Sequence, residues 1–239
     1  MPAVRVLGFD GDDTLWHSEI RFHVTQGEFR DLLKGHAPEA DVDKLLAETE
    51  MKNLSIYGYG IKSFTLSMLE TAIEITQRRI PTEDIQVILG WGKRMLTEPT
   101  KLLEGVEHTL RTLAGRYDMV LITKGDLFDQ ESKLAQSGLG DLFHGVEILS
   151  EKNAGSYRGV FKRRGIKPED FVMVGNSLRS DVVPVVSLGG RAVHIPYQVT
   201  WEHEQVPEDE LPKEGWKRIS SITELPATLD ALHAAGAST

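Results

Sequence analysis

The chain contains no cysteine among its 239 residues, which excludes disulfide bonds and thiolate chemistry. It also has no apolar run near the roughly 18 residues that a transmembrane helix needs. The apolar stretch at residues 4–9 is too short for the core of a signal peptide. We therefore expect a soluble, cytoplasmic protein without a membrane partner.

Basic residues are also scarce. The sequence has 27 Lys and Arg against 36 Asp and Glu, which gives a formal net charge of −9. A nucleic-acid-binding surface needs a basic face, so nucleic acid is not an expected partner. A small phosphorylated metabolite needs only a local cluster of cations and remains possible as a ligand. Apolar residues make up 40% of the chain, enough for a substantial core.

Short apolar runs predict a series of buried strands separated by helical patterns. The strands are expected at residues 4–9, 119–122, 146–149, 171–175 and 191–195, with a possible edge strand at 216–220. The helices are expected at residues 104–114, 128–138, 154–164, 181–188 and 223–234, and a loop at 198–215. This alternation predicts an α/β fold with a Rossmann-like parallel sheet that carries helices on both faces.

Residues 16–99 follow a different pattern. They show helical periodicity without a convincing strand, and four helices are expected at residues 20–33, 42–52, 61–77 and 81–96. An all-helical block inserted after the first strand predicts a second small domain. The core domain would then comprise residues 1–15 and 100–239.

Three carboxylates, Asp10, Asp12 and Asp13, follow the first strand within four residues, and Gly11 separates the first two. Like charges this close repel, so the cluster needs a proton or a cation. A divalent cation with oxygen ligands fits such a cluster, and α/β sheets bind ligands at the carboxyl ends of their strands. The alternative interpretation is an ordinary polar turn.

Polar residues also follow the next three strands of the core. Thr123 follows the second strand, where its hydroxyl can donate to a phosphate oxygen or simply cap a helix. Lys152 follows the third and can neutralise a carboxylate and a phosphate, or be a solvated lysine; Lys124 is the competing candidate. Asn176 and Asp181 follow the fourth strand, as possible metal ligands or as incidental polar residues of a turn.

Together these segments resemble the four motifs of the haloacid dehalogenase-like (HAD) hydrolase superfamily. The matching residues are Asp10-Gly11-Asp12-Asp13-Thr14, Ile122-Thr123-Lys124-Gly125, Lys152, and Gly175-Asn176-Ser177-Leu178-Arg179-Ser180-Asp181. The sequence departs from the fourth motif at Asn176, where the family has an aspartate. The resemblance implies that residues 16–99 form a C1-type cap, although the cap matches only by its position and helical character.

The resemblance implies a magnesium-dependent phosphatase that acts on a small phosphate monoester. Asp10 would be the nucleophile that forms an aspartyl-phosphate, and Asp12 the general acid and base. Gly11, Thr123, Lys124 and Lys152 would hold the phosphoryl group.

The implied ligands of Mg²⁺ are Asp10, the backbone carbonyl of Asp12, and Asn176 or Asp181. We favour Asn176 as the direct ligand, with Asp181 orienting a water ligand or Lys152. Because the Asn176 amide is neutral, the site should bind the cation less tightly. Trp16, directly after the first motif, is a candidate for the entrance of the site.

Three alternatives remain. A 2-haloacid dehalogenase shares the implied fold and nucleophile but needs no magnesium and lacks an acid at the position of Asp12, so Asp12 argues against it. A phosphomutase would use the same residues. A non-catalytic phosphate-binding regulatory protein on this fold also remains open, as does the choice between a monomer and a homodimer.

Overall fold

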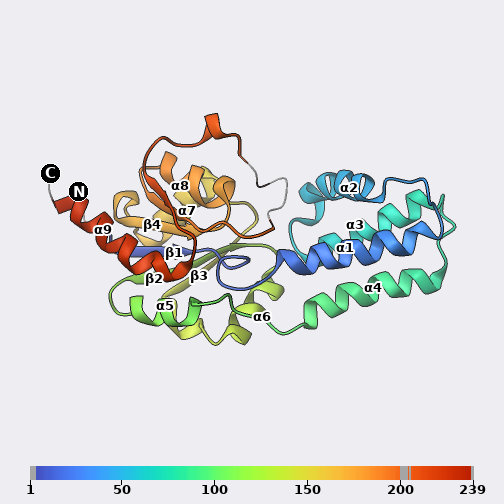
Figure 1. Cartoon of the computed structure of the whole chain (residues 1–239), viewed down its shortest axis with the longest axis horizontal. Coiled ribbons are helices and arrows are strands. Elements are labelled where there is room, and N and C mark those ends of the chain that lie inside the picture. Colours follow the sequence, from blue (N-terminus) through green and yellow to red (C-terminus); the bar gives the residue numbers. More distant parts are fainter. Residues whose placement is uncertain (1–3, 200–203, 205, 238–239) are drawn as a thin grey trace. The chain divides into compact units, whose positions relative to one another are not determined.

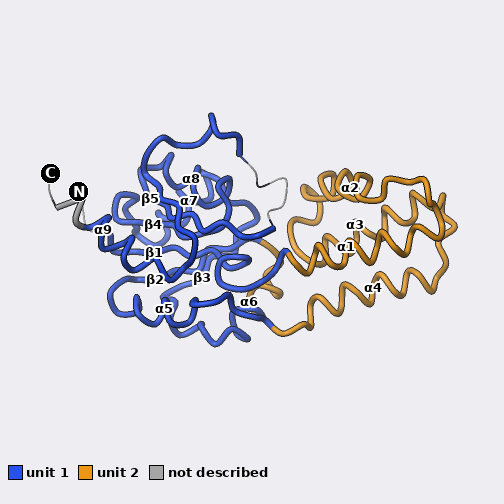
Figure 2. Tube along the Cα trace, viewed as in Figure 1, with its two compact units in different colours: residues 1–19, 100–124, 132–239 blue, residues 20–99, 125–131 orange. Residues whose placement is uncertain are grey.

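The computed structural model describes residues 4–199, 204 and 206–237 (Figure 1). The chain forms two compact units (Figure 2). Unit 1 comprises Met1–Glu19, Thr100–Lys124 and Ser132–Thr239, and unit 2 comprises Ile20–Pro99 and Gly125–Glu131. The first division falls at residues 19/20, where the sequence suggested 15/16, and the short segment 125–131 belongs with the helical unit.

Unit 1 is built on a six-stranded sheet with the order β3-β2-β1-β4-β5-β6. All five strand pairs are parallel, so the predicted parallel α/β sheet is confirmed. The strands are β1 (Val6–Phe9), β2 (Asp118–Lys124), β3 (Gly145–Leu149), β4 (Phe171–Gly175), β5 (Arg191–His194) and the edge strand β6 (Trp216–Arg218).

Helices cover both faces of this sheet, because successive strand residues point to opposite sides. Leu7 of β1 and Leu121 of β2 belong to one core cluster with residues of α5 (Val106–Leu113) and α9 (Leu225–Ala237), and Leu134 of α6 (Leu127–Ser137) packs against it. On the other face, Ile122 and Phe171 pack with residues of α7 (Ala154–Arg164) and α8 (Val183–Ser187). Figure 1 shows the strands running between these two helical layers.

The chain after β4 differs from the single helix predicted at residues 181–188. A π-helical turn at Leu178–Val182 precedes α8. Pro184 lacks an N–H, so a regular α-helix cannot continue through it from the preceding turn, whereas proline fits the first turn of a new helix. Asp181 lies in this wide turn, is fully buried, and places its carboxylate next to Gly175 at the end of β4.

Unit 2 contains four helices, as expected from the periodicity: α1 (Glu19–Lys34), α2 (Val42–Tyr57), α3 (Ile61–Ile75) and α4 (Thr82–Thr97). Asp41 caps α2 by accepting the backbone N–H of Lys44. The apolar faces of the helices share one core, which includes Phe29, Leu33, Leu46, Phe64, Met68 and Ile88.

Residues 200–203 and 205 of the predicted loop lie outside the described residues. The described part of this loop includes a short 3₁₀ turn, Glu208–Glu210. Within the described ranges, no helix is both long and apolar enough to cross a membrane.

The tight packing around Gly8 of β1 can be tested by mutation. A Cβ at this position would lie 2.4 Å from Phe171 Cζ and 2.9 Å from Met173 Sδ. We expect Gly8→Ala to destabilise the protein by about 1–3 kcal/mol in chemical denaturation, because the buried core must move. Gly90 is an exposed residue of α4, and a Cβ added there would have no neighbouring atom within 4 Å. Gly90→Ala should therefore stabilise the protein by up to about 1 kcal/mol. Equal effects of the two changes would contradict this packing argument.

Candidate active site

The strand order brings the predicted site residues of unit 1 to one edge of the sheet. Phe9 at the end of β1 pairs with Leu121 on one side and with Val174 on the other. The residues that follow β1, β2 and β4 therefore emerge side by side. This edge is the carboxyl end of every strand, where parallel sheets bind ligands.

At this edge, the Lys152 ammonium lies between two carboxylates. Its Nζ is 2.5 Å from Asp10 Oδ1 and 2.8 Å from Asp181 Oδ1. All three residues are buried. The other oxygen of Asp181 accepts the backbone N–H of Ser177 at 3.0 Å. Gly175 makes this approach possible, because a Cβ there would lie 2.1 Å from Asp181 Oδ2.

The electrostatics of this group follow from burial and from its excess of negative charge. Burial raises the pKa of Asp10 to about 7, against the pull of the Lys152 charge and with help from the repulsion by Asp181. Burial alone would lower the pKa of Lys152, but Asp10 and Asp181 raise it to about 12, so Lys152 is an ammonium. One cation therefore serves two carboxylates.

The Asn176 side chain lies next to Asp10 in this cluster. One terminal atom of its amide is 3.0 Å from Asp10 Oδ2 and 3.3 Å from the carbonyl oxygen of Asp12. With the amide nitrogen there, Asn176 donates hydrogen bonds to both oxygens. With the amide oxygen there, Asn176 accepts the Thr14 hydroxyl at 3.3 Å but also faces the oxygens of Asp10 and Asp12, an arrangement that a cation between them would stabilise.

The oxygen atoms of Asp10, Asp12 and Asn176 fit the coordination of a magnesium ion. Octahedral coordination at 2.0–2.1 Å separates neighbouring ligand oxygens by about 3 Å, close to the distances around the Asn176 amide. Within the described part of the chain, no group of three or more His, Asp or Glu side chains is arranged to hold a metal. A cation at this edge would therefore depend on the Asp12 carbonyl and the Asn176 amide as well as on Asp10.

Asp12 is held by a different set of partners. Its Oδ1 accepts the indole N–H of Trp16 at 2.8 Å and the ammonium of Lys133 at 3.0 Å. The prediction that Trp16 lines an entrance is wrong, because its side chain is fully buried. Lys133 was not predicted from the sequence, since a lysine within a polar stretch of a helix usually indicates a solvated face.

Gly11 and Thr123 lie next to each other. Thr123 is buried, and a Cβ on Gly11 would be 3.4 Å from its Oγ1 and 2.7 Å from the Trp16 ring. Any side chain at residue 11 would therefore force the buried Trp16 ring to move. Gly11 is itself buried, so the absence of a side chain here makes room for the Trp16 ring.

Lys124 and Lys152 contact different residues. Lys124 Nζ contacts Glu204 Oε1 at 2.5 Å and Ser180 Oγ at 3.0 Å. Glu204 was not a sequence candidate, because an acidic residue in a predicted loop carries no signal. His194, another residue that the sequence did not reveal, bonds through Nε2 to the Asn176 carbonyl at 2.9 Å.

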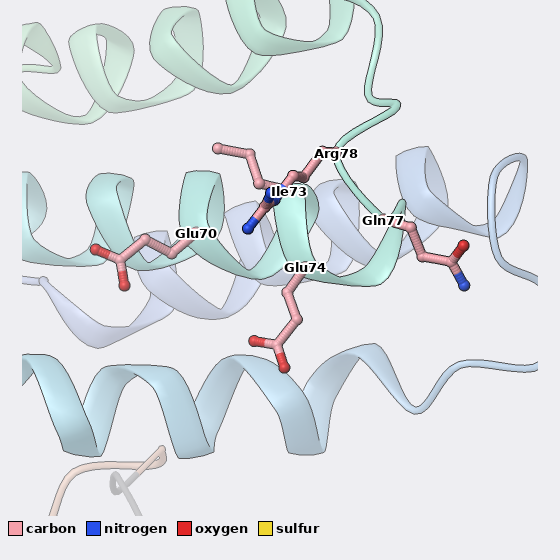
Figure 3. A pocket seen from close by; sticks show the side chains of 5 residues that line it. All are labelled: Glu70, Ile73, Glu74, Gln77 and Arg78. Atoms are coloured by element: carbon pink, nitrogen blue, oxygen red, sulfur yellow. The ribbon is translucent and has the colours of Figure 1, made fainter.

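A shallow hollow on unit 2 is not a competing candidate. It is lined by Glu70, Ile73, Glu74, Gln77 and Arg78 at the end of α3. Their side chains point in different directions rather than toward a common point (Figure 3). None of the residues predicted from the sequence motifs lines it.

Comparison with known proteins identifies the family. The sequence profile of the haloacid dehalogenase-like hydrolases matches residues 4–184. The chain belongs to this family. The expected superfamily is therefore confirmed, and the chain is an enzyme of the hydrolase class.

Relatives of this HAD-like hydrolase cover nearly its whole length. Human N-acylneuraminate-9-phosphatase is 27% identical over 246 residues, covering 97% of this chain and 96% of the relative. The glyceraldehyde 3-phosphate phosphatase of Pyrococcus furiosus is 22% identical over 242 residues, covering 97% and 94%. The crystal structure of a haloacid dehalogenase-like family hydrolase from Xanthomonas campestris is 41% identical, with a TM-score of 0.88 over 99% of this chain and 95% of that one.

The position of Lys152 in this HAD-like hydrolase predicts a large stability effect. Lys152→Met should leave two buried carboxylates without their cation and cost about 3–5 kcal/mol in urea denaturation at pH 7. The loss should shrink as the pH falls, because protonation of Asp10, whose pKa burial raises to about 7, removes one of the two repelling charges.

Lys62→Met provides a matched control. Lys62 pairs with Asp126 at 2.9 Å within unit 2, but its side chain is 54% exposed, so its loss should cost less than about 1 kcal/mol. Similar losses in the two variants would contradict a special role for the buried lysine.

Proposed function

We propose that this HAD-like hydrolase is a magnesium-dependent phosphatase that hydrolyses a small-molecule phosphate monoester through an aspartyl-phosphate. The proposal rests on one observation: two neighbouring carboxylates are held in place by different partners. Asp10 is held by buried Lys152, and Asp12, two residues later, by Lys133 and Trp16. Two acids in different environments can perform two different tasks in one reaction.

Asp10 is the proposed nucleophile. Its carboxylate attacks phosphorus, a P–O bond forms to Asp10, and the bond to the leaving oxygen breaks. Water then hydrolyses the aspartyl-phosphate and returns the free carboxylate, so that two easier steps replace one difficult displacement. Lys152 holds Asp10 Oδ1, which fixes the orientation of the carboxylate.

Asp12 is the proposed general acid and base. It gives a proton to the departing alkoxide in the first step and takes one from the attacking water in the second. The contacts to Lys133 and Trp16 fix this carboxylate in place. Its side chain is 29% exposed, so it can exchange protons with solvent between turnovers.

Gly11, Thr123 and Lys152 are proposed to hold the phosphoryl oxygens. The Gly11 backbone lies beside the Thr123 hydroxyl, which can donate to a phosphoryl oxygen. Positive charge and hydrogen-bond donors that are fixed before the reaction carry most of the rate in phosphoryl transfer.

Asp10, the Asp12 carbonyl and Asn176 are the proposed magnesium ligands. When bound, the cation supplies positive charge that keeps the Asp10 carboxylate ionised and offsets the charge of the phosphoryl group. Asp181 is assigned to Lys152, which it contacts at 2.8 Å. The high pKa of Asp10, about 7, supports the need for a further positive charge.

The relatives support a small phosphorylated substrate, since those described above are phosphatases of an acylneuraminate 9-phosphate and of glyceraldehyde 3-phosphate. We further propose that residues 16–99 are the C1-type cap implied by the family resemblance. The four helices of unit 2 share a core of their own, which supports an independent role for this segment.

Asp10→Asn should abolish the release of inorganic phosphate from a panel of phosphate monoesters assayed with and without Mg²⁺. The amide is nearly isosteric but a poor nucleophile, and the thermal melting curve should still show a folded protein. Phosphoryl transfer to a second sugar hydroxyl, without phosphate release, would instead indicate a phosphomutase.

Asp13→Asn is the matched control. The Asp13 carboxylate accepts the backbone N–H groups of Ser18 and Glu19 at the start of α1, and asparagine caps helices as well as aspartate. This variant should keep its activity. Equal activity of both variants would remove Asp10 from the role of nucleophile.

Asn176→Asp should lower the magnesium concentration at which binding is half-maximal in calorimetric titration, because an added anionic ligand strengthens an oxygen-ligand site. Asn153→Asp adds the same charge at the exposed cap of α7 and should leave the midpoint unchanged. If both changes shift the midpoint equally, the effect comes from net charge and Asn176 is not a ligand.

A further inference from the structure

Glu204 is surrounded by hydrogen-bond donors beside the candidate active site. We call the three donor residues, Lys124, Ser177 and Ser180, the cradle. Glu204 Oε1 accepts the Lys124 ammonium at 2.5 Å, and Glu204 Oε2 accepts the hydroxyls of Ser177 and Ser180, the latter at 2.7 Å. The Lys124 and Glu204 side chains are only 14% and 13% exposed, and both serines are buried. One ammonium and two hydroxyls thus surround one carboxylate.

The cradle is built from the same strand ends as the candidate active site. Lys124 directly follows Thr123 at the end of β2, and Ser177 directly follows Asn176 after β4. The backbone N–H of Ser177 donates to Asp181, which in turn contacts Lys152. Glu204, by contrast, lies 80 residues from Lys124 and after β5.

The cradle is selective for a negatively charged oxygen group. Burial alone would raise the pKa of Glu204, but Lys124 and the two hydroxyls lower it to about 2, so Glu204 is ionised. Charge-assisted hydrogen bonds of this kind are stronger than neutral ones. A second carboxylate, Glu151 Oε1, lies 3.7 Å from Lys124 Nζ.

We propose that Lys124, Ser177 and Ser180 form a subsite for a carboxylate group of the substrate, and that Glu204 is the chain's own occupant of this subsite, which the substrate displaces. The proposal rests on the proposed phosphatase function and narrows its substrate class to phosphate monoesters that carry a carboxylate. A tethered carboxylate competes with a free one through its effective concentration, so removing it should strengthen binding of the correct substrate.

The first experiment tests the cradle without any catalytic turnover. Glu204→Ala should melt at a lower temperature than the wild type, and acetate should restore the melting temperature more than chloride at equal ionic strength. Acetamide, which is neutral, should not restore it. In the double variant Glu204→Ala/Lys124→Met, acetate should have no advantage. Equal effects of acetate and chloride on Glu204→Ala would overturn the proposal.

The second experiment tests the substrate class. 3-Phosphoglycerate and glycerol 3-phosphate differ in carrying a carboxylate or a hydroxymethyl group. Glu204→Gln keeps the size of the side chain and should lower KM for 3-phosphoglycerate about tenfold, with KM for glycerol 3-phosphate and both kcat values unchanged. Lys124→Met should remove the preference for 3-phosphoglycerate.

The outcomes separate the two proposals. A fall in kcat for both esters in Glu204→Gln would make Glu204 a positioning residue for Lys124 and overturn the subsite. If the wild type hydrolyses neither these esters nor any other of the panel, the phosphatase function fails, and the acetate experiment still decides whether the cradle binds carboxylates.

Discussion

The Lys152 ammonium, buried between Asp10 and Asp181, is the interaction on which the rest of the site depends. Hydrophobic pairing of β1 with β4 brings the ends of these strands together whatever residues follow them. Two carboxylates at that point repel in a poorly solvated environment, and a nearby cation or a proton has to offset the cost. The lysine follows β3, two strands away from β1, so the charges are balanced only when β3, β2, β1 and β4 are all in place.

Asp12 shows how the chain separates two acids that are only two residues apart. The Asp10 side chain faces a buried ammonium, whereas Asp12 is turned toward Lys133 and the indole of Trp16. Asp10 and Asp12 therefore contact different lysines, and Asp12 does not compete with Asp10 and Asp181 for Lys152. This separation is a physical precondition for assigning different chemical roles to the two acids.

The features that the sequence predicted depend mainly on local pattern. Apolar runs and their alternation with helices were enough for the sheet and the four helices of unit 2, since these patterns reflect burial directly. The choice of Lys152 over Lys124 followed from its place after the third strand. Lys133 and Glu204 were missed because their partners lie 121 and 80 residues away, and polar residues carry no periodic signal that identifies a distant partner.

The neutral Asn176 side chain can form favourable contacts in the site both without a cation and with one. Asp10 and Asp181 already exceed the charge of Lys152 by one, and an aspartate at residue 176 would place a third carboxylate about 3 Å from Asp10 Oδ2. Without a cation, such a carboxylate would only repel its neighbours. The Asn176 amide can instead donate to Asp10 and to the Asp12 carbonyl, and rotation by half a turn presents its oxygen to the proposed magnesium ion. A site that is stable without a cation, and the weaker magnesium binding that we propose, would both follow from this one neutral residue.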